Sequence, residues 1–480
     1  MYIDASLRKN LDEIKTSLKN SQDLVIHEYK INDISLSVIL FDGLTSNMQV
    51  GELLLKPISS IDTANSGEEL FSIIDCEMMN SAEKKYCNTL DELYNLTMSG
   101  FAVVLVDGCR RAIAYGFQGF SVRGVEAPST EQTLYGSRES FNESAVTSVA
   151  LVRRKLKSKH LVVEGLTVGS MTNTSVKLLY CKNLADEEKV DEVRQNLQKI
   201  NLKTVFSSSY LIPFVCKNKV SLFSPIGKTE RPDTLCSMLC EGRIGIIVDG
   251  APFALIMPYL FIDNFHTVDD YINRPFYTWF IRCLKLISFC ITILLPSLFV
   301  SVVSFHRELI PQVLFDDMLF SVAKTPLSPM WESVLILMLY ELLREAGLRL
   351  PKPIGGAISV VGGLVIGDAA VTAGLISLPM LIVTGVTVIC SFTVAQMYQP
   401  VTILRFVFII LGGLTGFFGI TLGVAIMIIN ISSIEFLGVA YTLPISPLKK
   451  KFSKDLIFRR SFKRLNNINF TVKNISGKQR

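Results

Sequence analysis

The sequence contains none of the motifs, and few of the residues, on which most enzymes depend. Its four histidines, His27, His160, His266 and His306, are dispersed, and no P-loop, GxGxxG fingerprint, zinc-ligand spacing or nucleophile elbow occurs. The ten cysteines are scattered, which suits a reducing compartment better than a disulfide framework. We therefore expect no catalytic residue, no metal site and no cofactor, and an enzyme is not predicted.

An apolar leader is also missing. The first 20 residues, MYIDASLRKNLDEIKTSLKN, are polar and mixed in charge, without the apolar core of a secretory signal peptide. We therefore expect the N-terminal region to remain in the cytoplasm.

Charge is unevenly divided along the chain. Residues 1–273 hold 28 Lys and Arg against 34 Asp and Glu, whereas residues 274–480 hold 20 against 9. The formal charge of +5 thus describes neither half, and no nucleic-acid partner is predicted. A hydrophobic share of 49% beside a charged share of 19% favours a soluble N-terminal region followed by a membrane region.

Long hydrophobic runs are confined to the second half. Residues 286–305 carry no charge over 20 positions, which matches the length needed to cross a bilayer. Residues 354–404 contain one charge and break near Pro379 and Pro400, so we predict two segments there. Residues 406–434 are free of charge for 29 positions and predict a further crossing. The expected α-helical transmembrane domain spans residues 274–445 and contributes bilayer contacts.

The basic tail, residues 446–480, constrains the topology. From residue 449 onward it has 11 Lys and Arg against one Asp, so the positive-inside rule predicts a cytoplasmic C-terminus. With both termini inside, a multi-pass chain crosses an even number of times. Four segments suffice if residues 331–344 do not cross, and six if they do and residues 406–443 re-enter. The basic residues Arg344, Arg349 and Lys352 fit four segments poorly, because they would then lie outside.

One apolar segment has two distinct helical faces. Small residues that let helices approach closely form one stripe: Gly363, Gly367, Ala370 and Gly374. The opposite face has the residues that could line a pore: Val361, Val365, Asp368 and Thr372. If several copies surrounded an axis, the carboxylates would form an acidic ring that favours cations, and the valines a constriction. Alternatively, Asp368 is protonated or paired within its own chain.

A second stripe of small residues repeats the same spacing. Its members are Gly412, Gly416, Gly419 and Gly423. For either stripe, packing within the chain is the simplest interpretation.

The N-terminal region is predicted to hold two related subdomains, residues 1–125 and 126–273, of α/β or α+β type. Residues 101–117 and 243–260 each place Val-Asp-Gly between two apolar runs, which is typical of a hairpin. Residues 174–181 predict a strand and residues 185–200 an amphipathic helix. Three charged clusters predict either an interdomain or intersubunit ion network or a solvated face: Arg138-Glu139, Arg153-Arg154-Lys155 and Arg231-Pro232-Asp233.

Several longer strings resemble the A subunit of the GerA-type spore germinant receptors. They are residues 229–233 (TERPD), 241–253 (EGRIGIIVDGAPF), 304–311 (SFHRELIP), 342–356 (LLREAGLRLPKPIGG) and 360–378 (VVGGLVIGDAAVTAGLISL). The resemblance extends from about residue 101 to residue 447. Residues 135–141 (YGSRESF) depart from the family element Arg-Gly-Pro-Arg-Glu-Gly-Phe at three positions.

This resemblance implies a role in the spore inner membrane or cell membrane, beside a transporter-like B subunit that binds the nutrient and a lipoprotein C subunit. It also implies that A subunits self-associate into a nutrient-gated ion channel that triggers germination, with conduction along residues 360–377. Two other functions stay open, a non-conducting scaffold of the receptor and a secondary transporter. The few polar residues in the apolar segments argue against a transporter.

Overall fold

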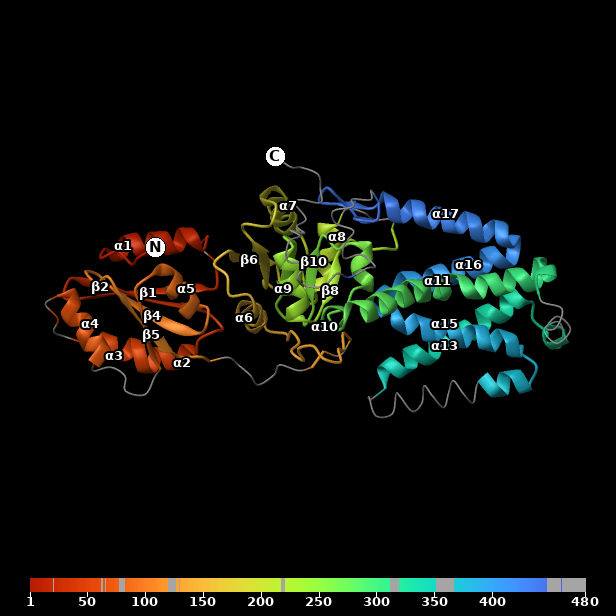
Figure 1. Cartoon of the computed structure of the whole chain (residues 1–480), viewed down its shortest axis with the longest axis horizontal. Coiled ribbons are helices and arrows are strands. Elements are labelled where there is room, and N and C mark those ends of the chain that lie inside the picture. Colours follow the sequence, from red (N-terminus) through yellow and green to blue (C-terminus); the bar gives the residue numbers. More distant parts are fainter. Residues whose placement is uncertain are drawn as a thin grey trace.

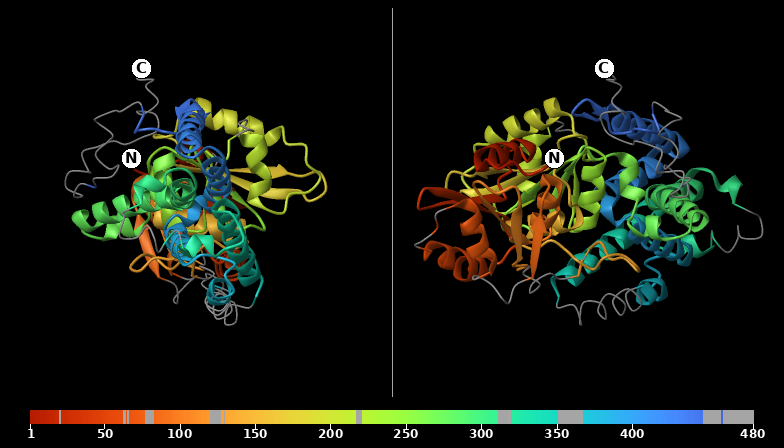
Figure 2. Two further views of the ribbon diagram at one scale, coloured as in Figure 1. Left: turned by 90° about the vertical axis from the view of Figure 1, so that its right-hand side faces the viewer. Right: turned by 60° about the vertical axis from the view of Figure 1, so that its left-hand side comes forward.

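The chain forms three parts that follow one another along its long axis (Figure 1). The computed structural model describes residues 1–19, 21–61, 64, 66–76, 83–119, 127–128, 130–216, 221–310, 318, 320–350, 367–446 and 459. We name the parts the first unit (residues 1–119), the second unit (residues 127–272) and the helical bundle (residues 275–433). The right-hand view in Figure 2 has the same order, with the second unit between the other two.

The first unit is a five-stranded antiparallel sheet covered by helices on both faces. Its strands, in the order β1-β2-β4-β5-β3, are β1 (Leu24–Ile31), β2 (Ile34–Phe41), β3 (Lys84–Cys87), β4 (Phe101–Val106) and β5 (Ala112–Gly116). One face packs against α1 (Leu7–Ser17) and α5 (Leu90–Thr97). The other face packs against α2 (Asn47–Val50), η1 (Gly51–Leu55), α3 (Lys56–Ser59) and α4 (Gly67–Cys76).

The second unit repeats this plan. Its strands, in the order β6-β7-β9-β10-β8, are β6 (Leu161–Val168), β7 (Thr174–Cys181), β8 (Gly227–Thr229), β9 (Ile244–Val248) and β10 (Ala254–Met257). Helices α6 (Ala145–Lys155) and α9 (Pro232–Cys240) cover one face. The other face packs against α7 (Glu187–Gln198), η2 (Ser208–Leu211) and α8 (Ile212–Val215). Because every strand pair is antiparallel, both units are α+β rather than α/β.

Both predicted hairpins are confirmed, as β4-β5 and β9-β10. Every residue of β4 and β9 is buried, because each strand is central and helices cover both of its sides. This explains why their sequences are continuous apolar runs without the alternation of a half-exposed strand.

The aspartate of each hairpin turn has the same second function. Asp107 Oδ1 accepts the backbone N–H of Leu7, at the start of α1, at 2.8 Å. Asp249 Oδ1 accepts the backbone N–H of Ala145, at the start of α6, at 2.9 Å. Each carboxylate therefore satisfies an N–H group that its helix cannot pair internally.

A buried ion pair joins the two units. Arg153 on α6 is fully buried, and its Nε lies 2.7 Å from Asp23 Oδ2 in the first unit. Its Nη2 donates to Ser21 Oγ at 2.9 Å. The charged cluster at 153–155 thus contributes to an interdomain contact, as one of the two sequence-based alternatives predicted.

Short elements connect the second unit to a bundle of helices that lie side by side (Figure 1). The connection consists of η3 (Phe261–Phe265) and α10 (Asp269–Ile272). The described bundle elements are α11 (Pro275–Phe305), η4 (Arg307–Leu309), α13 (Pro329–Arg349), α15 (Leu378–Thr393), η5 (Ala395–Met397), α16 (Tyr398–Thr415) and α17 (Phe417–Ser433). The breaks predicted near Pro379 and Pro400 are confirmed, since α15 begins at Leu378 and α16 at Tyr398.

Two helical segments of the bundle are long and apolar enough to cross a membrane, Pro275–Phe305 and Ala395–Thr415. Helices α15 and α17 are apolar but shorter. Helix α13, which contains residues 331–344, packs against α11, α15 and α16.

The single crossing predicted over residues 406–434 is wrong. Gly416 separates α16 from α17, with a φ of +64° that side chains other than glycine rarely adopt. The two helices pack against each other as a hairpin. The sequence alone did not reveal this turn, because its flanking residues are as apolar as the helices themselves.

The chain returns to the second unit after α17. A small hairpin, β11 (Glu435–Phe436) with β12 (Val439–Ala440), follows the helix. Phe436 and Leu437 are buried in the core formed by β7, β9 and α7. The last bundle helix is therefore anchored in the sheet that precedes the first one.

Candidate functional site

The first predicted stripe of small residues, from Gly363 to Gly374, lies only partly within the described residues. Val361, Gly363 and Val365 lie outside the described residues. Residues 367–372 are helical, with Gly367 and Ala370 buried. Gly367 faces Leu381 of α15, where an added Cβ would meet the leucine side chain at 3.5 Å. Gly374 lies in the turn that follows the helix rather than on its face.

The polar residues of the same helix point away from this contact. Asp368 and Thr372 are both exposed, and neither forms an ion pair or hydrogen bond with another described residue. Residues 367–372 thus have a side with buried Gly367 and Ala370 and a side with exposed Asp368 and Thr372. A role in conduction for these residues, together with Val361 and Val365, stays a prediction.

The second glycine stripe is divided between two helices. A Cβ on Gly412 would lie 2.7 Å from the carbonyl oxygen of Ser297 on α11, so glycine permits this close approach. Gly419 and Gly423 instead face residues of α16. With Gly416 in the turn, the four glycines serve different contacts within one chain.

A cavity of about 710 Å³ lies where the second unit meets the bundle, and we call it the junction cavity. Most of its walls come from four parts of the chain: residues 130–133, helix α9, the segment from η3 to Tyr271, and residues 392–396, which run from the end of α15 into η5. Its volume is typical of a small-molecule site.

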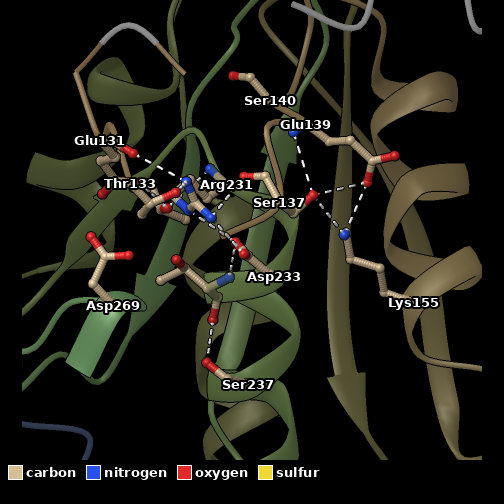
Figure 3. Close-up of polar contacts among 12 residues, drawn as sticks. Glu131, Thr133, Ser137, Glu139, Ser140, Lys155, Arg231, Asp233, Ser237 and Asp269 are labelled. Atoms are coloured by element: carbon tan, nitrogen blue, oxygen red, sulfur yellow. Dashed lines mark hydrogen bonds and ion pairs between the residues drawn. The ribbon is translucent and has the colours of Figure 1, made fainter. Parts of the chain in front are cut away.

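Arg231, directly before α9, is the central polar residue of one wall (Figure 3). It is 2% exposed, and it donates two hydrogen bonds to the Asp233 carboxylate, from Nε at 3.0 Å and from Nη2 at 2.6 Å. The remaining guanidinium N–H groups donate to the hydroxyl of Thr133 and to the carbonyl oxygens of Glu131 and Ser137, at 3.0–3.2 Å. The planar guanidinium thereby fastens residues 131–137 to the first turn of α9.

Two further carboxylates hold the same segment. Glu230 Oε1 accepts the backbone N–H groups of Thr130 and Glu131 at 2.6 and 2.8 Å. Glu139 pairs with Lys155 at 2.9 Å (Figure 3) and also with Arg154, both on α6. Residues 130–144, which precede α6 and which we call the linker, are thus attached to the rest of the second unit by several charged groups.

Ion pairs also join the second unit to α11. Arg243, 1% exposed, pairs with Asp263 in η3. Arg282 on α11 lies 3.0 Å from Asp270 on α10, and Lys285 lies 3.4 Å from the same carboxylate. Arg459 of the basic tail donates to the carbonyl oxygen of Asp270 at 2.7 Å.

Glu131 differs from the other acidic residues of the cavity. Its carboxylate accepts the Thr229 hydroxyl at 2.6 Å and the Gln396 side-chain amide at 3.4 Å, but no cation pairs with it among the described residues. Burial, and secondarily the neighbouring Glu230 charge, raise the pKa of Glu131 to about 7. Because Gln396 belongs to η5, Glu131 connects the linker to the bundle.

Sequence reasoning found only part of this site. It singled out the clusters at 138–139, 153–155 and 231–233, and the structure brings all three into the ion network of the second unit. It missed Glu131, Glu230 and Gln396, which have no distinctive spacing. It also missed the cavity, because its walls come from segments more than a hundred residues apart.

The family model described as "Bacillus/Clostridium GerA spore germination protein" matches residues 12–469. The chain belongs to the GerA family. It is similar to spore germination protein KA of Bacillus subtilis (strain 168), with 35% identity over 467 residues that cover 96% of this chain and 85% of the relative. The uncharacterized membrane protein YfkQ of the same organism is 31% identical over 464 residues, 95% of this chain and 89% of the relative.

A solved structure also aligns with the GerA chain. The N-terminal domain of the A subunit of the Bacillus megaterium spore germinant receptor GerK3 covers 54% of this chain and 98% of its own length, at 30% identity and a TM-score of 0.42.

The family match includes every residue that lines the junction cavity, from Thr130 to Pro444. Within the described residues of this GerA protein, no group of three or more His, Cys, Asp or Glu side chains is placed to hold a metal ion.

Proposed function

We propose that this chain is the A subunit of a nutrient-responsive spore germinant receptor, and that copies of it associate into a nutrient-gated ion channel that triggers germination. Membership of the GerA family, whose model is described as a spore germination protein, supports the receptor role. A transporter-like B subunit and a lipoprotein C subunit are the proposed partners. The two long apolar helices support a location in a membrane.

The gating proposal rests on one observation. The second unit contacts both the first bundle helix, α11, and the segment that follows the last bundle helix, α17. Phe261 packs edge-on against Phe289 of α11, with ring centroids 5.8 Å apart, and against Tyr441 beyond α17, at 5.9 Å. Phe436 reaches further, into the core of the second sheet. A displacement of the second unit would therefore move the first and last helices together.

Six crossings account best for the helix arrangement. They would be α11, α13, the helix containing residues 367–372, α15, α16 and α17, with η5 on the side of the second unit. Arg344, near the end of α13, lies over the Tyr398 ring at 3.5 Å, beside η5. This topology would keep Arg344 and Arg349 on the cytoplasmic side, as the positive-inside rule requires.

The pore is proposed along the helix that contains Asp368. Exposure of Asp368 and Thr372, opposite the buried Gly367, supports a polar face that neighbouring copies could share. If this face were in contact with lipid instead, the Asp368 carboxylate would lie in an apolar medium, which costs several kcal/mol.

Conductance tests the proposal against a non-conducting scaffold. The purified chain, with its B and C partners and a nutrient, should give cation-selective current in planar bilayers, and Asp368→Asn should reduce that selectivity. Cysteine at Gly363 or Val365 should cross-link copies efficiently. Absence of current with all partners present would favour the scaffold, and unchanged selectivity in Asp368→Asn would remove the acidic ring.

A further inference from the structure

The charged side chains that line the junction cavity are nearly all neutralised within the protein. Its carboxylates are Glu131, Asp233, Glu241 and Asp263, and its basic groups are Arg231, Arg243 and Lys285, with His266 beside them. The pairs described above are Arg231 with Asp233, Arg243 with Asp263 and Glu241, and Lys285 with Asp270, which lies outside the cavity wall.

Glu131 is the carboxylate that remains. The groups that face it from the neighbouring elements are the Thr229 hydroxyl of β8, the Gln396 amide of η5, and the charges of Glu230 and Arg231. Arg231 is already committed to Asp233 by two contacts, and Glu230 adds a like charge. Among the residues that the structure describes, the carboxylate of Glu131 therefore has no positive partner in an ion pair.

We propose that the junction cavity binds a small organic cation whose ammonium group pairs with Glu131. An ammonium brings both the missing charge and several N–H donors, and a partly desolvated carboxylate gains most from such a charge-assisted contact. The other walls suit an organic body, because Ile262, Val268 and Phe392 line the same cavity. Phe392 can also hold a cation over its ring face.

A metal ion is a poor fit for this position. Hard cations take about six or more oxygen ligands, several of them from carboxylates, whereas the other carboxylates here are already paired with guanidinium or ammonium groups. The cavity volume of about 710 Å³ is also far larger than an ion requires. The geometry thus favours an organic ligand.

A ligand in this position would contact two parts of the protein at once. Glu131 belongs to the linker before α6, whereas Phe392 and Thr393 end α15 and Gln396 lies in η5 of the bundle. Tyr259, from the second sheet, donates to Gln396 at 3.2 Å, so the same amide already connects sheet, linker and bundle. Binding is proposed independently of conduction and can be tested without it.

The test compares three probes of similar shape and different charge: benzylamine, benzyl alcohol and benzoate. Calorimetric titration of the full chain in lipid nanodiscs, with empty nanodiscs as the blank, should show saturable binding of benzylamine alone. Glu131→Gln should weaken it by about tenfold or more, the usual loss for one charged hydrogen bond. Glu143→Gln, which alters an exposed carboxylate without an ion pair on the same linker, is the matched control and should bind like the unaltered protein.

Proton release gives a second readout that needs no variant. Because the pKa of Glu131 is raised to about 7, an ammonium that pairs with the ionised form should displace a proton from the protonated fraction. Benzylamine affinity should therefore rise between about pH 6 and pH 8, with buffer-dependent heats that report the released proton.

Three outcomes would overturn the proposal. They are equal binding of benzoate or benzyl alcohol, benzylamine binding that Glu131→Gln leaves unchanged, and no saturable benzylamine binding up to about 10 mM, the weakest range of specific association. If Glu131→Gln does not fold, the unaltered protein provides the test. Benzylamine binding without the expected pH dependence and proton release would then contradict the proposal. Failure of these binding tests would leave the conductance proposal standing, and the reverse also holds.

Discussion

The two sheet units have the same strand order, and each has an aspartate at its β-hairpin turn. They differ in the residue that directly precedes one helix, which is α5 between β3 and β4 in the first unit and α9 between β8 and β9 in the second. In the first unit this position is Thr89, whose hydroxyl caps α5 while Glu92 caps the Thr89 backbone. In the second unit it is Arg231, which is buried and holds the linker. The same position therefore caps a helix in the first unit and holds residues 131–137 in the second unit.

The outer faces of the two sheets differ in the same sense. The first unit covers its face with α2, α3 and α4, all from its own sequence. The second unit has α7 and α8, and it completes this core with Phe436 and Leu437 from beyond the bundle. The second unit therefore completes one of its cores with residues from beyond the bundle, whereas the first unit covers the corresponding face with its own helices.

Matched cysteines allow each unit to be followed separately in the full chain. Cys87 in the first unit and Cys236 in the second are both buried, and burial raises the pKa of each thiol to about 12. Neither thiol should react with an alkylating reagent until its unit opens. Their labelling rates, read by mass spectrometry, thus report the stability of each unit.

Replacing Arg231 should have the largest effect. Arg231→Met leaves Asp233 and the linker carbonyls without their donor, and breaking such a buried pair lowers the opening free energy by about 4 kcal/mol. Cys236 labelling should accelerate strongly while Cys87 labelling stays unchanged. The equivalent change in the first unit, Thr89→Val, should cost about 1 kcal/mol and affect Cys87 alone. Equal effects of the two variants would contradict the distinction between the units.

Replacing Phe436, which reaches the second sheet from beyond the bundle, should have the second-largest effect on stability. Phe436→Ala leaves a space in the core of the second sheet and should lower the stability of that unit by about 3 kcal/mol. Faster Cys236 labelling with unchanged Cys87 labelling is the expected result. Phe418→Ala, at a position that is 73% exposed, is the control and should change neither rate.

The hairpin aspartates should behave alike. Asp107→Ala and Asp249→Ala each remove one helix cap, so each should destabilise its own unit by about 1 kcal/mol. Cys87 should report the first change and Cys236 the second. A clearly larger effect in one unit would show that the shared turn has acquired a further role there.

Acidification should have the smallest effect, confined to the second unit. The folded-state pKa of Glu131, about 7, lies above the ordinary value for a glutamate, so ionisation opposes the folded arrangement. Its contribution to stability is present at low pH and is lost as the pH rises through about 7. Cys236 labelling, corrected for thiol ionisation, should therefore be slower at pH 6 than at about pH 8. Glu131→Gln should remove this difference.

Local patterns in the sequence predicted much of the scaffold. Val-Asp-Gly between apolar runs identified both hairpins, because a tight turn needs residues of that type and central strands need continuous apolar runs. Strand β7 and helix α7 followed from periodicity in the same way, with helix ends within two residues. The choice between α/β and α+β could not be made, because strand direction depends on pairing between distant segments.

The junction could not be predicted in this way. Gln396 donates a hydrogen bond to Glu131, which is 265 positions away in the sequence, and no local pattern around either residue predicts this contact. The turn at Gly416 was missed for a related reason, since an apolar hairpin and an apolar helix have the same composition.

By itself, the sequence determined the division into a charged region, an apolar region and a basic tail, together with the hairpins that organise both sheets. These follow from composition and from interactions between near neighbours. Only the tertiary structure decided that the chain returns to the second sheet after the bundle, and that no described cation pairs with Glu131 in the cavity between them. Burial and charge pairing depend on which distant segments meet, and that information is absent from any short stretch of the chain.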